Sequence, residues 1–210
     1  MTPNLPNLIT SVRAVVAPVV AYLLFQSALW SRLAAFLLFL SAALSDVWDG
    51  HLARSRGQIT SFGKIVDPMA DKLLLLTTLL PLYLLTVRHA ELAGLPLFGA
   101  IPAWAVLVLL GREVLIATLR LAAARRGRVV GARGLAKRKT VAQNVFIGAA
   151  ILWVAFRSAG YGGEGGLSAL FREFHGWVTS GVLVIALVLT VLSMFLYLAA
   201  FRRIFAEGRP

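Results

Sequence analysis

The chain has 210 residues, of which 59% are hydrophobic and only 14% are charged, and its mean hydropathy is +0.82. This balance excludes an ordinary soluble globular domain and indicates an integral membrane protein with room for roughly six spans of about 20 residues. The formal net charge is +12, but basic residues are usual at the cytoplasmic ends of membrane helices, so no nucleic-acid partner is expected. The absence of cysteine excludes disulfides and thiolate metal sites.

Six apolar segments of helix length follow one another along the chain, at residues 8–29, 32–53, 66–87, 101–123, 140–157 and 177–201. Continuous apolar runs favour helices over the alternating strands of a membrane barrel. We therefore predict an all-α integral membrane protein in which residues 1–210 form a single domain of six transmembrane helices. Proline removes a backbone donor, so Pro68 is expected at the entry to the third helix or at a kink in it.

The basic residues predict the orientation of these helices. When connections are assigned alternately to the two faces, sixteen of the 21 Lys and Arg residues fall on the side of both termini. Arg32, Arg88, Arg157 and Arg172 fall on the other side, and Arg112 is left within a span. By the positive-inside rule, both termini and the connection between the second and third segments are expected in the cytoplasm.

Four of the nine acidic residues gather around that connection. They are Asp46, Asp49, Asp67 and Asp71. At about 100° per helical residue, Asp49 lies about 60° to one side of Asp46 and Gly50 about 40° to the other, while Ala53 returns to within about 20° of Asp46. These four residues therefore share one face. Gly63, Asp67 and Asp71 share one face of the next helix in the same way. Each helix thus combines two carboxylates with small residues, which let membrane helices approach closely.

Four carboxylates at short range cannot all stay ionised unless cations neutralise them. Oxygen ligands of this kind suit Mg²⁺, Mn²⁺ or Ca²⁺. Two such ions could neutralise a diphosphate and stabilise displacement at phosphorus, and at a membrane surface the diphosphate would be linked to a lipid. The alternative is structural, with the aspartates capping helix ends or pairing with nearby cations. Those cations are Arg54, Arg56, Lys64 and Lys72.

The full pattern is Asp46-x2-Asp49-Gly50-x2-Ala53-Arg54-x8-Gly63-x3-Asp67-x3-Asp71. It resembles, at all eight positions, the motif of the CDP-alcohol phosphotransferases. The resemblance implies a six-helix membrane fold, usually a homodimer, that uses two divalent cations, Mg²⁺ or Mn²⁺. Members of this family displace CMP from a CDP-linked substrate with the hydroxyl of a second alcohol.

The resemblance also implies a role for each position of the motif. Asp46, Asp49 and Asp67 are expected to be metal ligands, and Asp71 is expected both to bind metal and to deprotonate the attacking hydroxyl. The positions expected to admit or contact the CDP group are Gly50, Ala53, Arg54 and Gly63. Asn7, Thr10 and Arg13 are further candidates for nucleotide contact, although Thr10 is equally well suited to cap the first helix.

Three further segments, Pro6–Pro18, Gly111–Arg120 and Lys137–Asn144, resemble bacterial members of the family that use sn-glycerol 3-phosphate as the acceptor. The implied reaction joins CDP-diacylglycerol to glycerol 3-phosphate, giving phosphatidylglycerophosphate and CMP in the bacterial inner membrane. A phosphate-bearing acceptor needs its own cations. The candidates are Arg112, Arg120, Lys137, Arg138 and Lys139.

Two alternatives remain open. The same metal site would serve another acceptor, such as inositol phosphate, phosphatidylglycerol or serine. A protein of another class, a divalent-cation transporter, would need acids near the midplane of the bilayer with access from both faces. Here the acids stand beside Arg54, Arg56 and Lys64 at one face.

Overall fold

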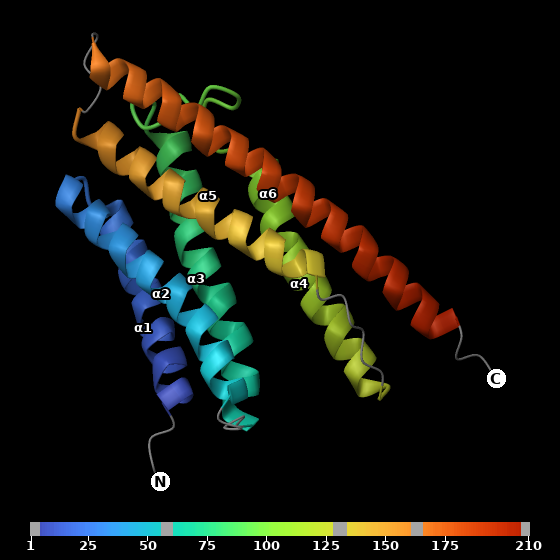
Figure 1. Cartoon of the computed structure of the whole chain (residues 1–210). Coiled ribbons are helices and arrows are strands. Elements are labelled where there is room, and N and C mark those ends of the chain that lie inside the picture. The colour runs from blue at the N-terminus through green and yellow to red at the C-terminus, as the bar shows by residue number, and fades with distance from the viewer. Residues whose placement is uncertain (1–4, 56–60, 128–133, 161–165, 207–210) are drawn as a thin grey trace.

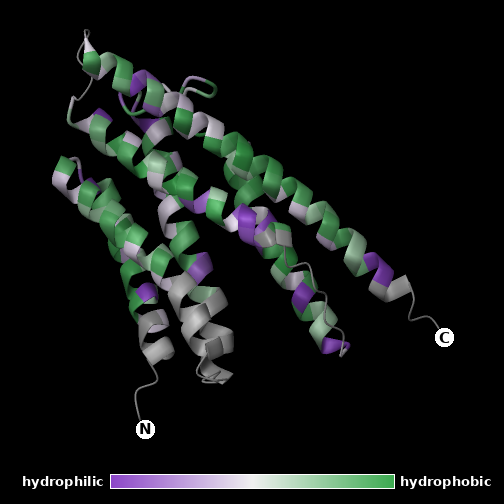
Figure 2. Cartoon of the chain, in the orientation of Figure 1, coloured by the Kyte–Doolittle hydropathy of each residue, from purple (hydrophilic) through white to green (hydrophobic). Residues whose placement is uncertain are grey.

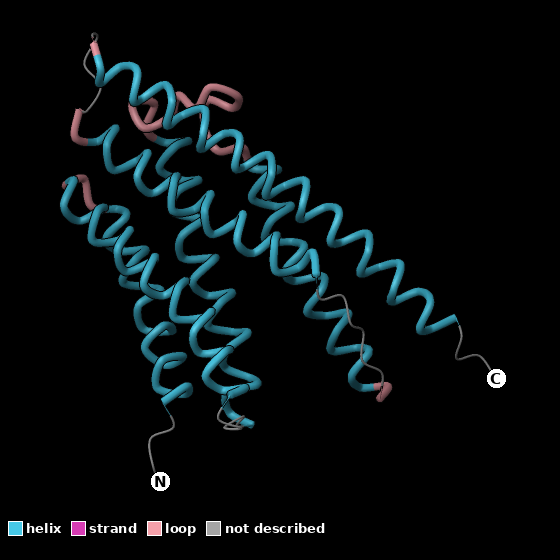
Figure 3. The backbone as a smooth tube through the Cα atoms, viewed as in Figure 1, coloured by secondary structure: helices cyan, strands magenta, loops and turns pink. Residues whose placement is uncertain are grey.

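The computed structural model of the chain describes residues 5–55, 61–127, 134–160 and 166–206. Side chains are described in these ranges except at 5–9, 46–55, 61–68, 134, 136 and 204–206. Helices joined by loops make up this part of the chain (Figure 3). They are α1 (Leu5–Phe25), α2 (Leu29–Ser55), α3 (Ser61–Arg88), α4 (Ala103–Arg125), α5 (Gly134–Ser158) and α6 (Leu167–Ala206).

Each of the six predicted segments corresponds to one helix, and most of the helices extend beyond the predicted ends. The largest difference is at α6, which begins at Leu167 and not at residue 177. Hydropathy detects the lipid-facing part of a helix and misses polar turns that continue it. For the same reason α3 begins at Ser61, so Pro68 lies inside the helix. Of the two predicted alternatives the helix entry is wrong, and the kink stays a prediction.

Successive helices run in alternating directions, which places their ends at two opposite poles (Figure 1). We call the pole where α2 ends and α3 begins the near end, and the pole where α5 ends and α6 begins the far end. Helix α1 packs against both α2 and α3, while α5 packs against α2, α3 and α6. Helix α4 contacts α3 and α6. Residues near the centres of α2 to α5 therefore face a common interior.

The helices are predominantly hydrophobic along most of their described length (Figure 2). Among the described residues, Met69–Arg88, Lys137–Ser158 and Leu167–Arg203 are long and apolar enough to cross a membrane. Helices α1 and α2 contain shorter apolar stretches, Thr10–Phe25 and Leu29–Ser45. The chain is a membrane protein with six helices, and the prediction that all six cross the bilayer is supported by this criterion for three of them.

The connection between α3 and α4 closes the far end of the bundle. Two side chains of α5 hold its backbone: Trp153 Nε1 donates to Leu92 O at 3.0 Å, and Arg157 Nε donates to Glu91 O at 2.8 Å. Leu92 and Leu95 of this connection are themselves buried. Two carbonyl groups of this connection thus find donors on α5, which ties the loop to the bundle.

Candidate active site

The aspartate motif lies on the last turns of α2 and the first turns of α3, so the predicted helical placement of its residues is confirmed for the backbone. The side chains of most of the motif lie outside the described residues. They are Asp46, Asp49, Gly50, Ala53, Arg54, Gly63 and Asp67. Their predicted roles, and the packing of the two helices through their glycines, stay predictions. Asp71 is the residue of the motif whose side chain the structure describes.

Asp71 is joined to α1 by an ion pair. Arg13 Nη1 donates to Asp71 Oδ1 at 2.7 Å. The Arg13 side chain is 2% exposed, whereas that of Asp71 is 47% exposed. A buried arginine thus fixes one oxygen of a carboxylate whose side chain is still half-exposed. The sequence suggested pairing of the acids with Arg54, Arg56, Lys64 or Lys72, and it did not predict this partner from α1.

Asp71 also lines a cavity of about 120 Å³ between α2, α3, α4 and α5. Lys139, Glu113 and Gln143 line the same cavity. Its remaining walls are Phe39, Ala42, Ala43, Lys72, Leu74, Leu75, Thr140, Asn144 and Ile147. The cavity therefore brings together the predicted proton acceptor and one of the cations predicted to bind the acceptor phosphate.

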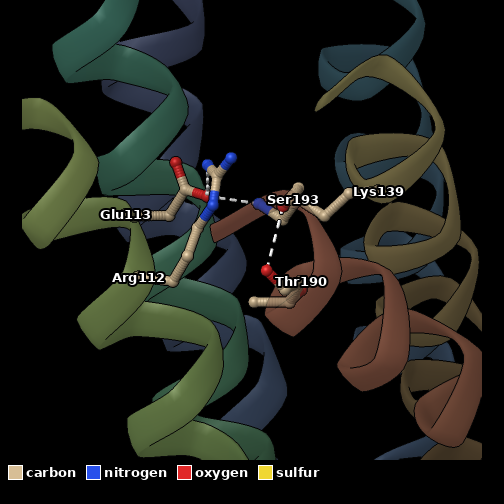
Figure 4. A network of polar contacts seen from close by, with 5 residues as sticks. All are labelled: Arg112, Glu113, Lys139, Thr190 and Ser193. Atoms are coloured by element: carbon tan, nitrogen blue, oxygen red, sulfur yellow. Dashed lines mark hydrogen bonds and ion pairs between the residues drawn. The ribbon is translucent and has the colours of Figure 1, made fainter. Parts of the chain in front are cut away.

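Three charged residues meet where α4 faces α5 (Figure 4). Arg112 Nη1 donates to Glu113 Oε1 at 2.9 Å, and Lys139 Nζ donates to the same oxygen. The side chains of Lys139 and Arg112 are 4% and 9% exposed, and that of Glu113 is 22% exposed. The Glu113 carboxylate thus pairs with two buried cations, and the three side chains together have a net positive charge. Both cations were predicted from the sequence, which left open a structural pairing of Arg112 with Glu113.

Gln143 was missed by the sequence analysis. Its side chain is buried, lines the cavity, and has an amide oxygen that accepts no hydrogen bond from the described residues. An unsatisfied acceptor in such a place costs free energy unless a ligand or water supplies a donor. The only available signal was its position in the segment Lys137–Asn144, one turn after Lys139.

Arg112 and the remaining described candidates are not among the residues that line the cavity. Arg120 and Lys137 are exposed, on α4 and α5 respectively, and so is Arg138. Thr10 is buried within α1, five residues after its first residue, so the alternative of a helix cap is wrong. Asn7 is in the first turns of α1, and its side chain lies outside the described residues.

The donor set of the motif suits a hard divalent cation. Aspartates spaced by three residues on α2 and by four residues on α3 share faces of two continuous helices, and all of them offer oxygen. Of this set the described carboxylate, Asp71, is half-exposed and lines the cavity between α2 and α5. A carboxylate with this exposure is accessible from solvent, as a metal ligand must be.

Comparison with known sequences assigns the class of protein. Residues 3–192 match the CDP-alcohol phosphatidyltransferase family. The chain belongs to this family and is an enzyme of that class, which is generally metal-dependent. The family resemblance drawn from the aspartate motif is therefore confirmed.

Several relatives carry a more specific name. A CDP-diacylglycerol–glycerol-3-phosphate 3-phosphatidyltransferase of Bacillus subtilis is 36% identical over 161 residues, 71% of this chain and 77% of its own length. Enzymes of the same name from Pseudomonas fluorescens and Escherichia coli are 36% and 31% identical. They match 98% and 95% of this chain, and 94% and 95% of their own length.

Proposed function

We propose that the chain transfers the phosphatidyl group of CDP-diacylglycerol to sn-glycerol 3-phosphate, giving phosphatidylglycerophosphate and CMP. The names of the relatives support this substrate pair. The observation that carries the proposal for this chain is the shared cavity, which has Asp71 on one wall and Lys139 on another. A phosphorylated alcohol needs such a combination, a base for its hydroxyl and a cation for its phosphate.

The donor substrate would bind at the near end, with its diphosphate over the aspartates of α2 and α3. Two Mg²⁺ or Mn²⁺ ions held by Asp46, Asp49, Asp67 and Asp71 would neutralise that diphosphate. Gly50, Ala53, Arg54 and Gly63, with Asn7 and Thr10, are the proposed contacts of the CDP group. A mainly apolar groove of about 370 Å³ between α1 and α2, which Arg13 and Ala42 help to line, offers a place for an acyl chain.

The acceptor would occupy the cavity. Its phosphate would lie at Lys139 and Arg112, which together exceed the charge of Glu113 by one. The amide oxygen of Gln143 would accept a hydrogen bond from a hydroxyl of the glycerol, satisfying a buried polar atom. Asp71 would take the proton from the attacking hydroxyl, whose oxygen forms a bond to the phosphorus attached to diacylglycerol as the bond to CMP breaks.

We further propose that all six helices cross the inner membrane of a bacterial cell, with both termini and the active site in the cytoplasm. The excess of basic residues at the near end supports this orientation. It also places the site on the side where the soluble substrate would be made. By resemblance to the family, we propose that the chain forms a homodimer.

The test is release of CMP by the purified chain in detergent with CDP-diacylglycerol, Mg²⁺ or Mn²⁺, and a panel of alcohols. We expect release with glycerol 3-phosphate and its loss in Asp71→Asn. Release with inositol phosphate, phosphatidylglycerol or serine alone would refute the proposed acceptor and retain the reaction class. Uptake of divalent cation into vesicles without CMP release would favour a transporter.

A further inference from the structure

The far end of the bundle carries a second basic and apolar site that the proposed reaction does not use. Between α5 and α6 a small pocket of about 30 Å³ is lined by aromatic side chains together with Arg157, Ser168 and Arg172. A larger open groove of about 910 Å³ adjoins it, because Phe156, Ser168 and Phe171 line both. The two spaces therefore form one site with a basic part and an apolar part.

Two guanidinium groups define the basic part. Arg157 is held in place through Nε, which donates to Glu91 O at 2.8 Å, and its guanidinium lies 5.4 Å from the centre of the Trp153 ring. Within the described residues, neither Nη group of Arg157 donates to another residue. Arg172 on α6 is close enough to repel it electrostatically, while the exposed carboxylate of Glu91 attracts it. Two arginines thus line one small pocket, and the Nη groups of Arg157 are available to an anionic ligand.

The groove supplies the apolar part. Besides the two shared aromatic residues, its wall consists of Leu167, Leu170 and Phe174, with Ser168. These three side chains are 83%, 64% and 66% exposed and share one face of α6. The volume of the groove is near the upper end of the range found for pockets that bind drug-sized ligands. A long hydrocarbon chain fits such a surface, whereas a free phosphate would use none of it.

The length of α6 places this site near the lipid headgroups. Forty residues of helix span about 60 Å, roughly twice the thickness of the hydrocarbon core. The helix therefore extends beyond the core even with a tilt, and the charged Arg172 and Glu173 of its first turns favour the headgroup region at the far end. Arginines beside exposed apolar side chains are typical of that depth.

We propose that the far-end site binds an anionic phospholipid, with the phosphate at Arg157 and Arg172 and an acyl chain in the groove beside Phe174. Basic pockets between membrane helices are known to bind anionic headgroups. The basic pocket favours an anionic headgroup over a neutral one. The apolar groove favours a lipid over a soluble anion, because only a lipid would bury the apolar surface of the groove. This site is separate from the catalytic cavity, which lies nearer the opposite pole.

The test is native mass spectrometry of the purified full-length chain titrated with dioleoyl phosphatidylglycerol or dioleoyl phosphatidylcholine. We expect phosphatidylglycerol to bind more tightly, and Arg172→Gln to weaken it about tenfold, the loss of one charge-assisted contact, without changing phosphatidylcholine binding. Arg88→Gln removes a far-end charge that lines neither space, so it should leave both affinities unchanged. Arg172→Gln should also keep full CMP release, which separates this site from catalysis.

Equal affinity for the two lipids, or equal weakening by Arg172→Gln and Arg88→Gln, would overturn the proposal, since either indicates no selective site. A second variant, Phe174→Gln, tests the groove and should weaken both lipids. Unchanged lipid binding in that variant, or displacement of phosphatidylglycerol by inorganic phosphate at equal concentration, would show that the site takes a soluble anion and not a lipid.

Discussion

Arg13 on α1 holds Asp71 on α3 through a bond of 2.7 Å between Nη1 and Oδ1. The arginine is buried and the carboxylate is half-exposed, so the contact fixes the orientation of a group that still faces the cavity. In the proposed reaction Asp71 must meet a hydroxyl at hydrogen-bond distance. Arg13 is then a positioning residue that acts through Asp71.

Replacing Arg13 should therefore lower kcat. Displacing a reacting group by about 1 Å can lower the reaction rate about 10²-fold, and we expect kcat to fall by that order in Arg13→Met. Arg13→Lys keeps the charge but lacks the planar guanidinium group, so its kcat should be intermediate. CMP release under saturating substrates measures both, with Arg88→Met as the control for loss of an exposed arginine. A loss confined to the KM for CDP-diacylglycerol would instead indicate that Arg13 binds the nucleotide.

Lys139→Met should raise the KM for glycerol 3-phosphate. The change removes a buried cation from the cavity wall while keeping most of its volume, and Arg112 remains to pair with Glu113. A charge-assisted hydrogen bond to phosphate contributes about 1.5–3 kcal/mol, so the KM should rise at least about tenfold.

The matched control for this experiment is Lys137→Met, two residues earlier on α5 and exposed. We expect its KM for glycerol 3-phosphate to change less, and the KM for CDP-diacylglycerol to be unaffected in both variants. Equal effects of the two substitutions would mean that the acceptor phosphate lies outside the cavity.

These contacts also show which parts of the site can be predicted from the sequence. The helical placement of the aspartates and the choice of Arg112 and Lys139 followed from residue type, spacing and resemblance. The pairing of Arg13 with Asp71 joins residues 58 positions apart, and the orphan oxygen of Gln143 depends on how α5 is rotated. Helical periodicity defines the faces of one helix, whereas such contacts require knowledge of which faces meet.

The ends of the helices illustrate the same limit. The apolar pattern predicted α6 from residue 177, but Leu167–Gly176 continues the helix with charged residues on it. No proline interrupts this stretch, and its glycine is accommodated by close packing. Hydropathy therefore located the most apolar part of the helix and missed the first turns, which form the far-end site.

Mg²⁺ or Mn²⁺ should raise the thermal unfolding midpoint of the wild-type chain. A ligand that binds only the folded state at 100 times its dissociation constant stabilises it by about 2.7 kcal/mol. We expect the increase to disappear with chelator and to be much reduced in Asp49→Asn, which removes one proposed ligand. Na⁺ at equal ionic strength controls for screening. An equal increase in wild type and Asp49→Asn would place the bound cation elsewhere.

Gly176 is needed where α6 passes closest to the loop between α3 and α4. A Cβ atom there would lie 2.9 Å from Pro96 Cδ and 3.0 Å from Trp153 Cζ3. Neither neighbour can move aside easily, because the proline side chain is closed into a rigid ring and the indole of Trp153 is hydrogen-bonded to Leu92 O. Gly176→Ala should therefore destabilise the protein by about 1–3 kcal/mol, as overpacking does.

Gly181, five residues further along the same helix, supplies a matched comparison because a Cβ atom there would meet nothing within 4 Å. Gly181→Ala should be neutral or stabilise by up to about 1 kcal/mol through helix propensity. Thermal unfolding of both variants in the same detergent measures the difference directly. Equal midpoints would mean that Pro96 and Trp153 can move aside, and the far end would then be more loosely packed than its contacts indicate.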